Sequence, residues 1–240
     1  TLSTNAAAPS TLSGTFQEVP QRTARFEWWR SSFDVWRRAT HPQATPASGY
    51  FYLSPMAWGD DAWYGYVGDL VYGYVPGNAQ DLDVSLDYGD PFLSWGKALN
   101  VTHRYSLPLR LPGTTAGALS LFLSDTQVYK EGMAPISPRI SPPEGLLVDG
   151  ANAQVDRTLA SLTPTISCSA PRVGTPSAYR VRVYRLYTLS SSPTYTRYGG
   201  VATFPTATPS LKLPPGVLQA NERYAILVTA YVTPGVDLAQ

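Results

Sequence analysis

The sequence predicts an all-β protein made of two β-sandwich domains. Of its 240 residues, 43% are hydrophobic and 15% are charged, and its 16 tyrosines, 22 prolines and 19 glycines favour strands and loops over helices. Apolar residues recur at every second position in several segments, which is the period of a strand with one buried face. Turn signals such as Pro76-Gly77 and Pro112-Gly113 separate these segments.

The N-terminal half contains a series of expected strands. They cover residues 12–19, 24–28, 49–53, 63–74, 81–88, 100–109 and 117–123. The strict alternation after Asp81 places Leu82, Val84, Leu86 and Tyr88 on one face, which we expect to be buried. Aromatic residues in the segment 29–38 have helical spacing instead, which predicts a short helix or an irregular crossing segment.

The C-terminal third alternates in the same way, over residues 163–184 and 209–232. Leu218 is followed six residues later by Tyr224. This spacing is similar to that of a tyrosine corner, in which the hydroxyl bonds to backbone upstream. On these features, residues 147–240 resemble a fibronectin type III domain. The resemblance implies a seven-stranded sandwich of the immunoglobulin-like class.

The expected organisation is therefore a tail, two sandwiches and a linker between them. The parts are an N-terminal tail at 1–13, a sandwich of unknown family at 14–133, a proline-rich linker at 134–146 and the type III-like domain at 147–240. Four prolines within residues 134–145 favour an extended, semi-rigid connection. The alternative is that this stretch is an edge segment of the second sandwich. The N-terminal part weakly resembles β domains of uncharacterised secreted bacterial proteins that carry type III domains.

The tail is rich in small and polar residues, with Leu2 and Leu12 as its large apolar side chains. Such a segment lacks the apolar area to hold one conformation by itself. We expect backbone hydrogen bonds to a sheet edge to hold it. That edge belongs either to its own chain or to a neighbouring subunit, as in strand addition.

Composition argues against several classes of function. A formal net charge of +1 gives no field for nucleic acid, and no apolar run is long enough to span a membrane. Two histidines and one cysteine supply neither a zinc site nor a recognisable catalytic set, so we expect no enzyme and no cofactor. Calcium is left open as a weak alternative near Asp60, Asp61 and Asp90. Cys168 stands where type III domains usually have a core tryptophan, and we expect it to be a buried small hydrophobe.

The most unusual local feature is a dense aromatic run within residues 50–74. Its candidate site residues are Trp58, Trp63, Tyr64, Tyr66, Tyr72 and Tyr74. Because strand side chains alternate between two faces, not all of these rings can be inside. The run is consistent with core packing, with a protein interface, or with a platform on which sugar rings stack.

We therefore expect a non-enzymatic, exported structural or adhesive protein, either a surface module or a subunit of an extracellular assembly. It would act outside the cell or in the cell envelope, after an export signal has been removed. Its expected partner is another protein or a second copy of itself. The alternative function is a carbohydrate-binding module that uses the exposed aromatic residues of 50–74.

Overall fold

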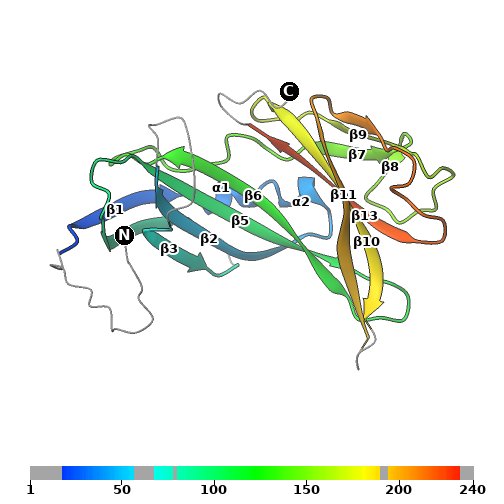
Figure 1. The fold of residues 1–240 in the computed structure, drawn as a ribbon, viewed down its shortest axis with the longest axis horizontal. Coiled ribbons are helices and arrows are strands. Elements are labelled where there is room, and N and C mark those ends of the chain that lie inside the picture. Colours follow the sequence, from blue (N-terminus) through cyan, green and yellow to red (C-terminus); the bar gives the residue numbers. More distant parts are fainter. Residues whose placement is uncertain (1–17, 57–67, 78–79, 190–193, 233–240) are drawn as a thin grey trace, which may run out of the picture.

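The computed structural model describes residues 18–56, 68–77, 80–189 and 194–232 (Figure 1). The predicted all-β class is confirmed, and the sheets are antiparallel. The segment expected as a helix or crossing forms two short helices, α1 (Arg30–Asp34) and α2 (Arg37–Thr40). No helix in the described ranges is long and apolar enough to cross a membrane. Most of the expected strand 12–19 lies outside the described residues.

The first sandwich packs a two-stranded sheet on a four-stranded sheet. The small sheet pairs β1 (Gln21–Trp28) with β4 (Leu82–Gly89). The larger sheet has the order β3 (Val71–Val75), β2 (Thr45–Pro55), β5 (Lys97–Leu109) and β6 (Gly117–Val128). The predicted inward face of β4 packs against the first core, which holds Phe26, Trp28, Phe51, Val101 and Leu121.

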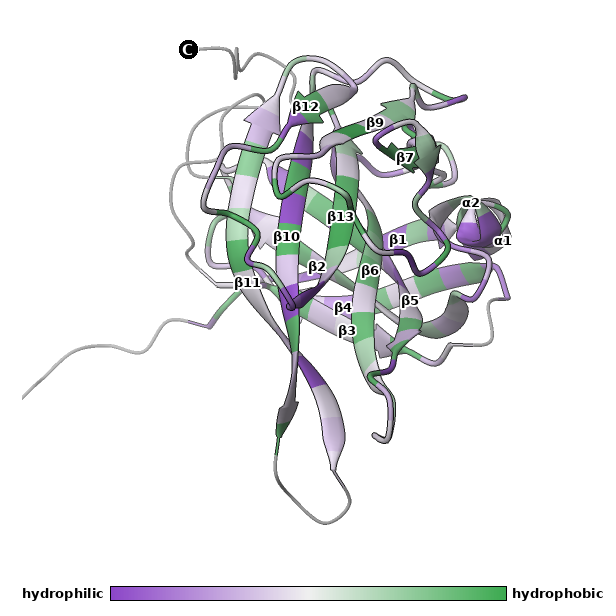
Figure 2. Cartoon of the chain, turned by 90° about the vertical axis from the view of Figure 1, so that its right-hand side faces the viewer, coloured by the Kyte–Doolittle hydropathy of each residue, from purple (hydrophilic) through white to green (hydrophobic). Residues whose placement is uncertain are grey.

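The second sandwich pairs a sheet of short strands with a sheet of long ones (Figure 2). The short strands are, in sheet order, β12 (Ser210–Lys212), β9 (Thr165–Ser169), β7 (Glu144–Val148) and β8 (Ala151–Asn152). The long strands are β11 (Tyr195–Thr206), β10 (Ala178–Leu189) and β13 (Arg223–Tyr231). In Figure 2 the hairpin of β10 and β11 projects beyond the body of the molecule.

A second, separate core fills this sandwich. Leu218 is buried in it, and Tyr224 packs against it while its hydroxyl accepts a hydrogen bond from the N–H of Gln219 at 2.9 Å. This bond has the form expected of a tyrosine corner. Cys168 is half-buried rather than part of this core, with its Sγ 3.7 Å from the carbonyl oxygen of Pro209. The immunoglobulin-like class of this sandwich stays a prediction.

The proline-rich segment between the cores is bonded to both sandwiches. Ile136 is buried in the first core, and its N–H donates to the carbonyl of Glu27 at 2.8 Å. Five residues on, the hydroxyl of Ser141 accepts from the N–H groups of Arg172 and Val173 at 2.9 and 3.2 Å. The segment is therefore held by the first sandwich at Ile136 and by the second at Ser141.

A buried histidine lies within the first core. His103 is 0% exposed and stacks on Phe33, with ring centroids 6.1 Å apart. Neither of its ring nitrogens has a hydrogen-bond partner among the described residues. Burial, helped by repulsion from the Arg30 guanidinium and opposed by Asp34, lowers the pKa of His103 to about 4. This histidine is therefore neutral in the folded protein at neutral pH.

The histidine makes the stability of the first sandwich depend on pH. The unfolded chain binds a proton at His103 below pH about 6.5, whereas the folded chain binds it only near its lowered pKa of about 4. We therefore expect the free energy of unfolding to fall as the pH drops through this window, by up to about 3 kcal/mol from this group. Urea titrations of the native chain and of His103→Phe measure it. Both proteins contain His41, so the difference between their two pH profiles isolates the contribution of His103. Parallel profiles would contradict the assignment.

Candidate functional site

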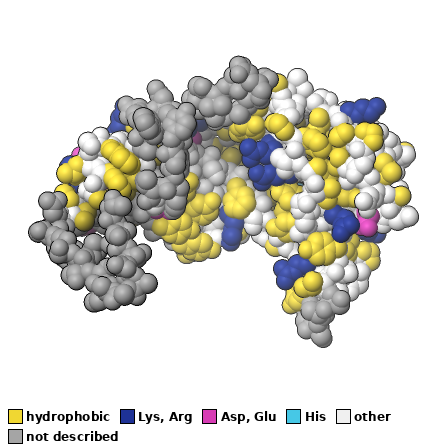
Figure 3. Space-filling model, viewed as in Figure 1, with side chains coloured by type: hydrophobic (Ala, Val, Ile, Leu, Met, Phe, Trp, Pro, Cys, Tyr) yellow, Lys and Arg dark blue, Asp and Glu magenta, His cyan; other side chains and the backbone are white. Residues whose placement is uncertain are grey.

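A large cavity of the described structure lies between the two sandwiches, and we call it the interdomain groove. Its volume is about 1550 Å³. β6 lines one side, β13 lines the other, and residues of the proline-rich segment, including 139–143, also line it. Figure 3 shows the corresponding hollow between the two lobes of the molecule.

The groove is bordered by the edges of two sheets. Eight consecutive residues of β6, 121–128, and eight consecutive residues at β13, 225–232, line it. A strand that turned a face toward the groove would contribute only alternate residues, because side chains point to opposite faces in turn. Among the described residues, β6 pairs only with β5 and β13 only with β10. Both open edges therefore border the same space.

These two edges carry few of the features that usually protect an edge strand, apart from the guanidinium of Arg139, which donates to the carbonyl of Thr126 on β6 at 2.6 Å. β13 has no charged residue after Arg223 and no proline, and Asp125 is the only charged residue of β6. The other edges are blunted: β3, β12 and β8 have five, three and two residues, and β11 contains Arg197, Pro205 and a register shift against β10. β1 and β4 carry several charged side chains. Short length, charge, proline and bulges all discourage further strand pairing.

A buried seam fixes the two sandwiches relative to each other. The hydroxyl of Thr196, on β11, accepts from the N–H of Leu111 at 2.8 Å and lies 2.6 Å from the hydroxyl of Thr114. The N–H of Thr196 donates to the carbonyl of Thr115 at 2.9 Å. Thr196 is 1% exposed, so these bonds lie away from solvent. Tyr184, Tyr198 and Leu227 of the second sandwich also pack against the first core.

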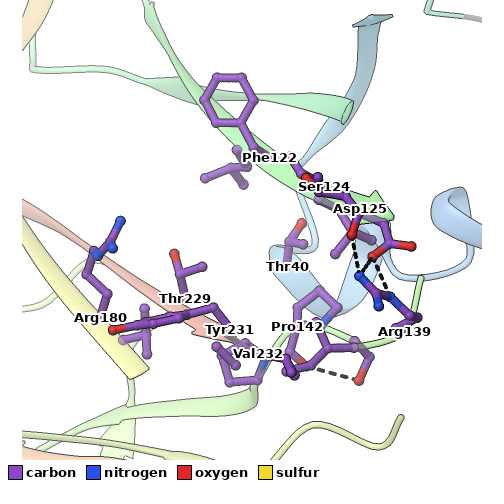
Figure 4. A pocket seen from close by; sticks show the side chains of 18 of the residues that line it. Thr40, Phe122, Ser124, Asp125, Arg139, Pro142, Arg180, Thr229, Tyr231 and Val232 are labelled. Carbon is purple, nitrogen blue, oxygen red and sulfur yellow. Dashed lines mark hydrogen bonds and ion pairs between the residues drawn. The ribbon is translucent and has the colours of Figure 1, made fainter. Parts of the chain in front are cut away.

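The walls of the groove combine apolar, hydroxyl and charged side chains. In Figure 4, Phe122, Ser124 and Asp125 lie on one side, and Arg180, Thr229 and Tyr231 on the other. Phe122 is 51% exposed. Arg139 donates to the carboxylate of Asp125 from its Nε at 2.7 Å, so this buried acid is already paired. The guanidinium of Arg180 lies over the ring of Tyr231, 5.2 Å from its centroid.

The aromatic run forms a row on the outer face of β2 and β3. Tyr50 stands opposite Tyr74, and Tyr52 opposite Tyr72. The ring centroids of Tyr50 and Tyr72 are 5.9 Å apart and stacked, and Tyr72 and Tyr74 are 57% and 62% exposed. We call these four rings the tyrosine row. The other predicted members, Trp58, Trp63, Tyr64 and Tyr66, lie outside the described residues.

The acidic residues do not gather into a metal site in the described part of the chain. No group of three or more histidine, cysteine, aspartate or glutamate side chains is found there. The carboxylate of Asp90 is buried and lies 3.1 Å from the ammonium of Lys97. Asp60 and Asp61 lie outside the described residues.

Sequence reasoning found the tyrosines but missed the groove. The sequence signal for the groove was β13, which has no charged residue after Arg223 and no proline to discourage pairing with another strand. Comparison of the chain with protein-family models, curated proteins and solved structures gave no match. Functional inference therefore depends on the groove and the tyrosine row themselves.

Replacing the hydroxyl of Thr196 by a methyl group tests the buried seam. Thr196→Val leaves the N–H of Leu111 without its acceptor in a buried place and removes the hydrogen bond between the Thr196 and Thr114 hydroxyls, while the Thr114 hydroxyl still donates to the carbonyl of Leu111. We expect the free energy of unfolding to fall by roughly 1–3 kcal/mol. Thr188→Val, at the exposed position opposite Thr196, is the matched control and should change it by less than about 0.5 kcal/mol. Equal effects in urea titrations would show that the seam has no special role.

Proposed function

We propose that the protein is a non-enzymatic structural or adhesive module that binds an extended segment of a partner protein in the interdomain groove. The segment adds as a strand to the open edges of β6 and β13. The observation that carries this proposal is the convergence on one groove of two long sheet edges that have little charge and no proline. The module would serve in an extracellular or cell-envelope assembly.

The backbone supports a strand as the ligand. An open edge presents unpaired N–H and C=O groups, which an added strand pairs along its whole length. Eight residues on each side of the groove correspond to about 26 Å of extended chain. A typical strand has about five or six residues, so the groove is long enough to hold one.

The size of the groove supports a polymer rather than a small molecule. Its volume of about 1550 Å³ exceeds the roughly 300–1,000 Å³ of typical small-molecule sites. Exposed apolar groups such as Phe122, together with Thr229 and Tyr231, are the side chains that contact alternate residues of a bound strand.

A displayed library of random peptides of about 12 residues tests the proposal, since that length covers one long strand. We expect selected peptides to share apolar alternation and to bind the purified chain. Thr229→Glu places a charge in the groove and should weaken their binding at least about tenfold, because an edge charge opposes strand addition. Thr203→Glu is the matched control, since Thr203 is exposed on strand β11 of the same sheet and does not line the groove.

The library also has a clear negative result. If no peptide is enriched, or if Thr229→Glu and Thr203→Glu weaken the selected peptides equally, then the groove is not a strand-binding site. Circular dichroism melting of both variants checks that each is folded.

The tyrosine row favours a second candidate function, the binding of a carbohydrate. Stacked, exposed rings offer flat faces to sugar rings, and hydroxyl groups at their ends donate and accept hydrogen bonds. The row lies on β2 and β3, at the opposite edge of the sheet from β6. A sugar there would leave the groove free for a protein segment.

A glycan array tests this second function. We expect the native chain to retain at least one neutral glycan, and Tyr72→Ala combined with Tyr74→Ala to lose it, because the two most exposed rings of the row are removed. Phe122→Ala removes an equally exposed ring in the groove and should retain the glycan. An array without any bound glycan, or retention by the double variant, would exclude the row as a sugar site.

A further inference from the structure

The sheet that borders the groove on the β13 side carries positive charge without any acid. Its three strands, β10, β11 and β13, contain five arginines and no aspartate, glutamate or lysine. Two of the arginines, Arg180 and Arg182, line the groove. They stand opposite Thr229 and Leu227 of β13, on the face that the groove borders.

Neither Arg180 nor Arg182 has a carboxylate partner among the described residues. Both are half-buried. Of the acids that line the groove, Asp125 is paired with Arg139 and also accepts from the amide of Gln127, and Glu131 is exposed on the segment after β6. Two half-buried arginine residues thus line the groove with no partner of opposite charge.

This arrangement is costly unless an anion binds. Residues two apart on a strand have their side chains on the same face, about 7 Å apart, so the two like charges repel each other. A carboxylate bound there offsets this repulsion and can form a bidentate contact with a guanidinium group. The ring of Tyr231 under Arg180 holds that guanidinium at the groove wall.

We infer that the strand received by the groove is an acidic segment of a partner protein, with carboxylates at two alternate positions that pair with Arg180 and Arg182. This inference rests on the proposed function and adds the chemistry of the partner. Alternate positions of a strand repeat at the same spacing as the two arginines, so both pairs form together. Residues 1–17 contain no acidic side chain, so the chain's own N-terminal tail does not supply them.

Two synthetic peptides test the inference. One alternates valine with glutamate, and the other is the same peptide with glutamine in place of glutamate. By fluorescence anisotropy we expect the full chain to bind the glutamate peptide at least about tenfold more tightly than the glutamine peptide. This preference should shrink when sodium chloride is raised from about 50 mM to about 500 mM, since salt screens the pairs.

Variants assign the preference to the two arginines. Arg180→Gln with Arg182→Gln should reduce the preference to about one, and Arg180→Glu with Arg182→Glu should turn it toward a lysine peptide. Arg185→Gln, on the same strand but outside the groove, should keep it. Arg182→Gln alone leaves the contact of Arg180 with Tyr231 in place. A partial loss of the glutamate preference in this variant therefore cannot come from a disturbed Arg180–Tyr231 contact.

Three results would overturn the inference. Equal binding of both peptides would leave the groove a strand site without charge selection, and the proposed function would stand. Binding of neither peptide would refute the acidic partner, while the peptide library decides separately on the groove. Binding of polygalacturonate without the glutamate peptide would assign the arginines to an acidic polysaccharide.

Discussion

The buried seam around Thr196 is the interaction on which the rest of the arrangement depends. It joins the loop after β5 to the start of β11 through a hydroxyl that solvent does not reach. Buried polar groups that are fully bonded fix one geometry, because any other arrangement leaves them unsatisfied. The seam and the bonded segment around Ile136 and Ser141 therefore hold two separate cores at one spacing. That spacing creates the groove.

The edges of β6 and β13 expose backbone groups to which a partner strand would bind. Open edges form hydrogen bonds with water or with another strand, and long apolar ones also promote aggregation. Elsewhere the described sheets end in short, charged or irregular strands. By contrast, the two edges that border the groove belong to long strands with little charge and no proline. A strand that enters there pairs with backbone, while Phe122 and Tyr231 contact its side chains.

The sequence predicted the class of the fold because alternation records which strand face is buried, as Leu82 to Tyr88 illustrate. It did not predict the groove, because alternation says nothing about which edges remain unpaired or where two sandwiches meet. The seam at Thr196 has no sequence signature, since its partners lie about 80 residues away. The arginines of β10 alternate with apolar residues as on any polar strand face, and only their position beside β13 links them to a site.

Amide hydrogen exchange tests the central claim most directly, because it reports on backbone hydrogen bonds residue by residue. Alternate amides of β6 and β13 should exchange quickly in the free protein and become protected together when a groove-binding peptide is added. Amides of β2 and β10, which already have strands on both sides, should change little. Protection of one strand without the other, or of neither, would contradict a strand added between the two edges.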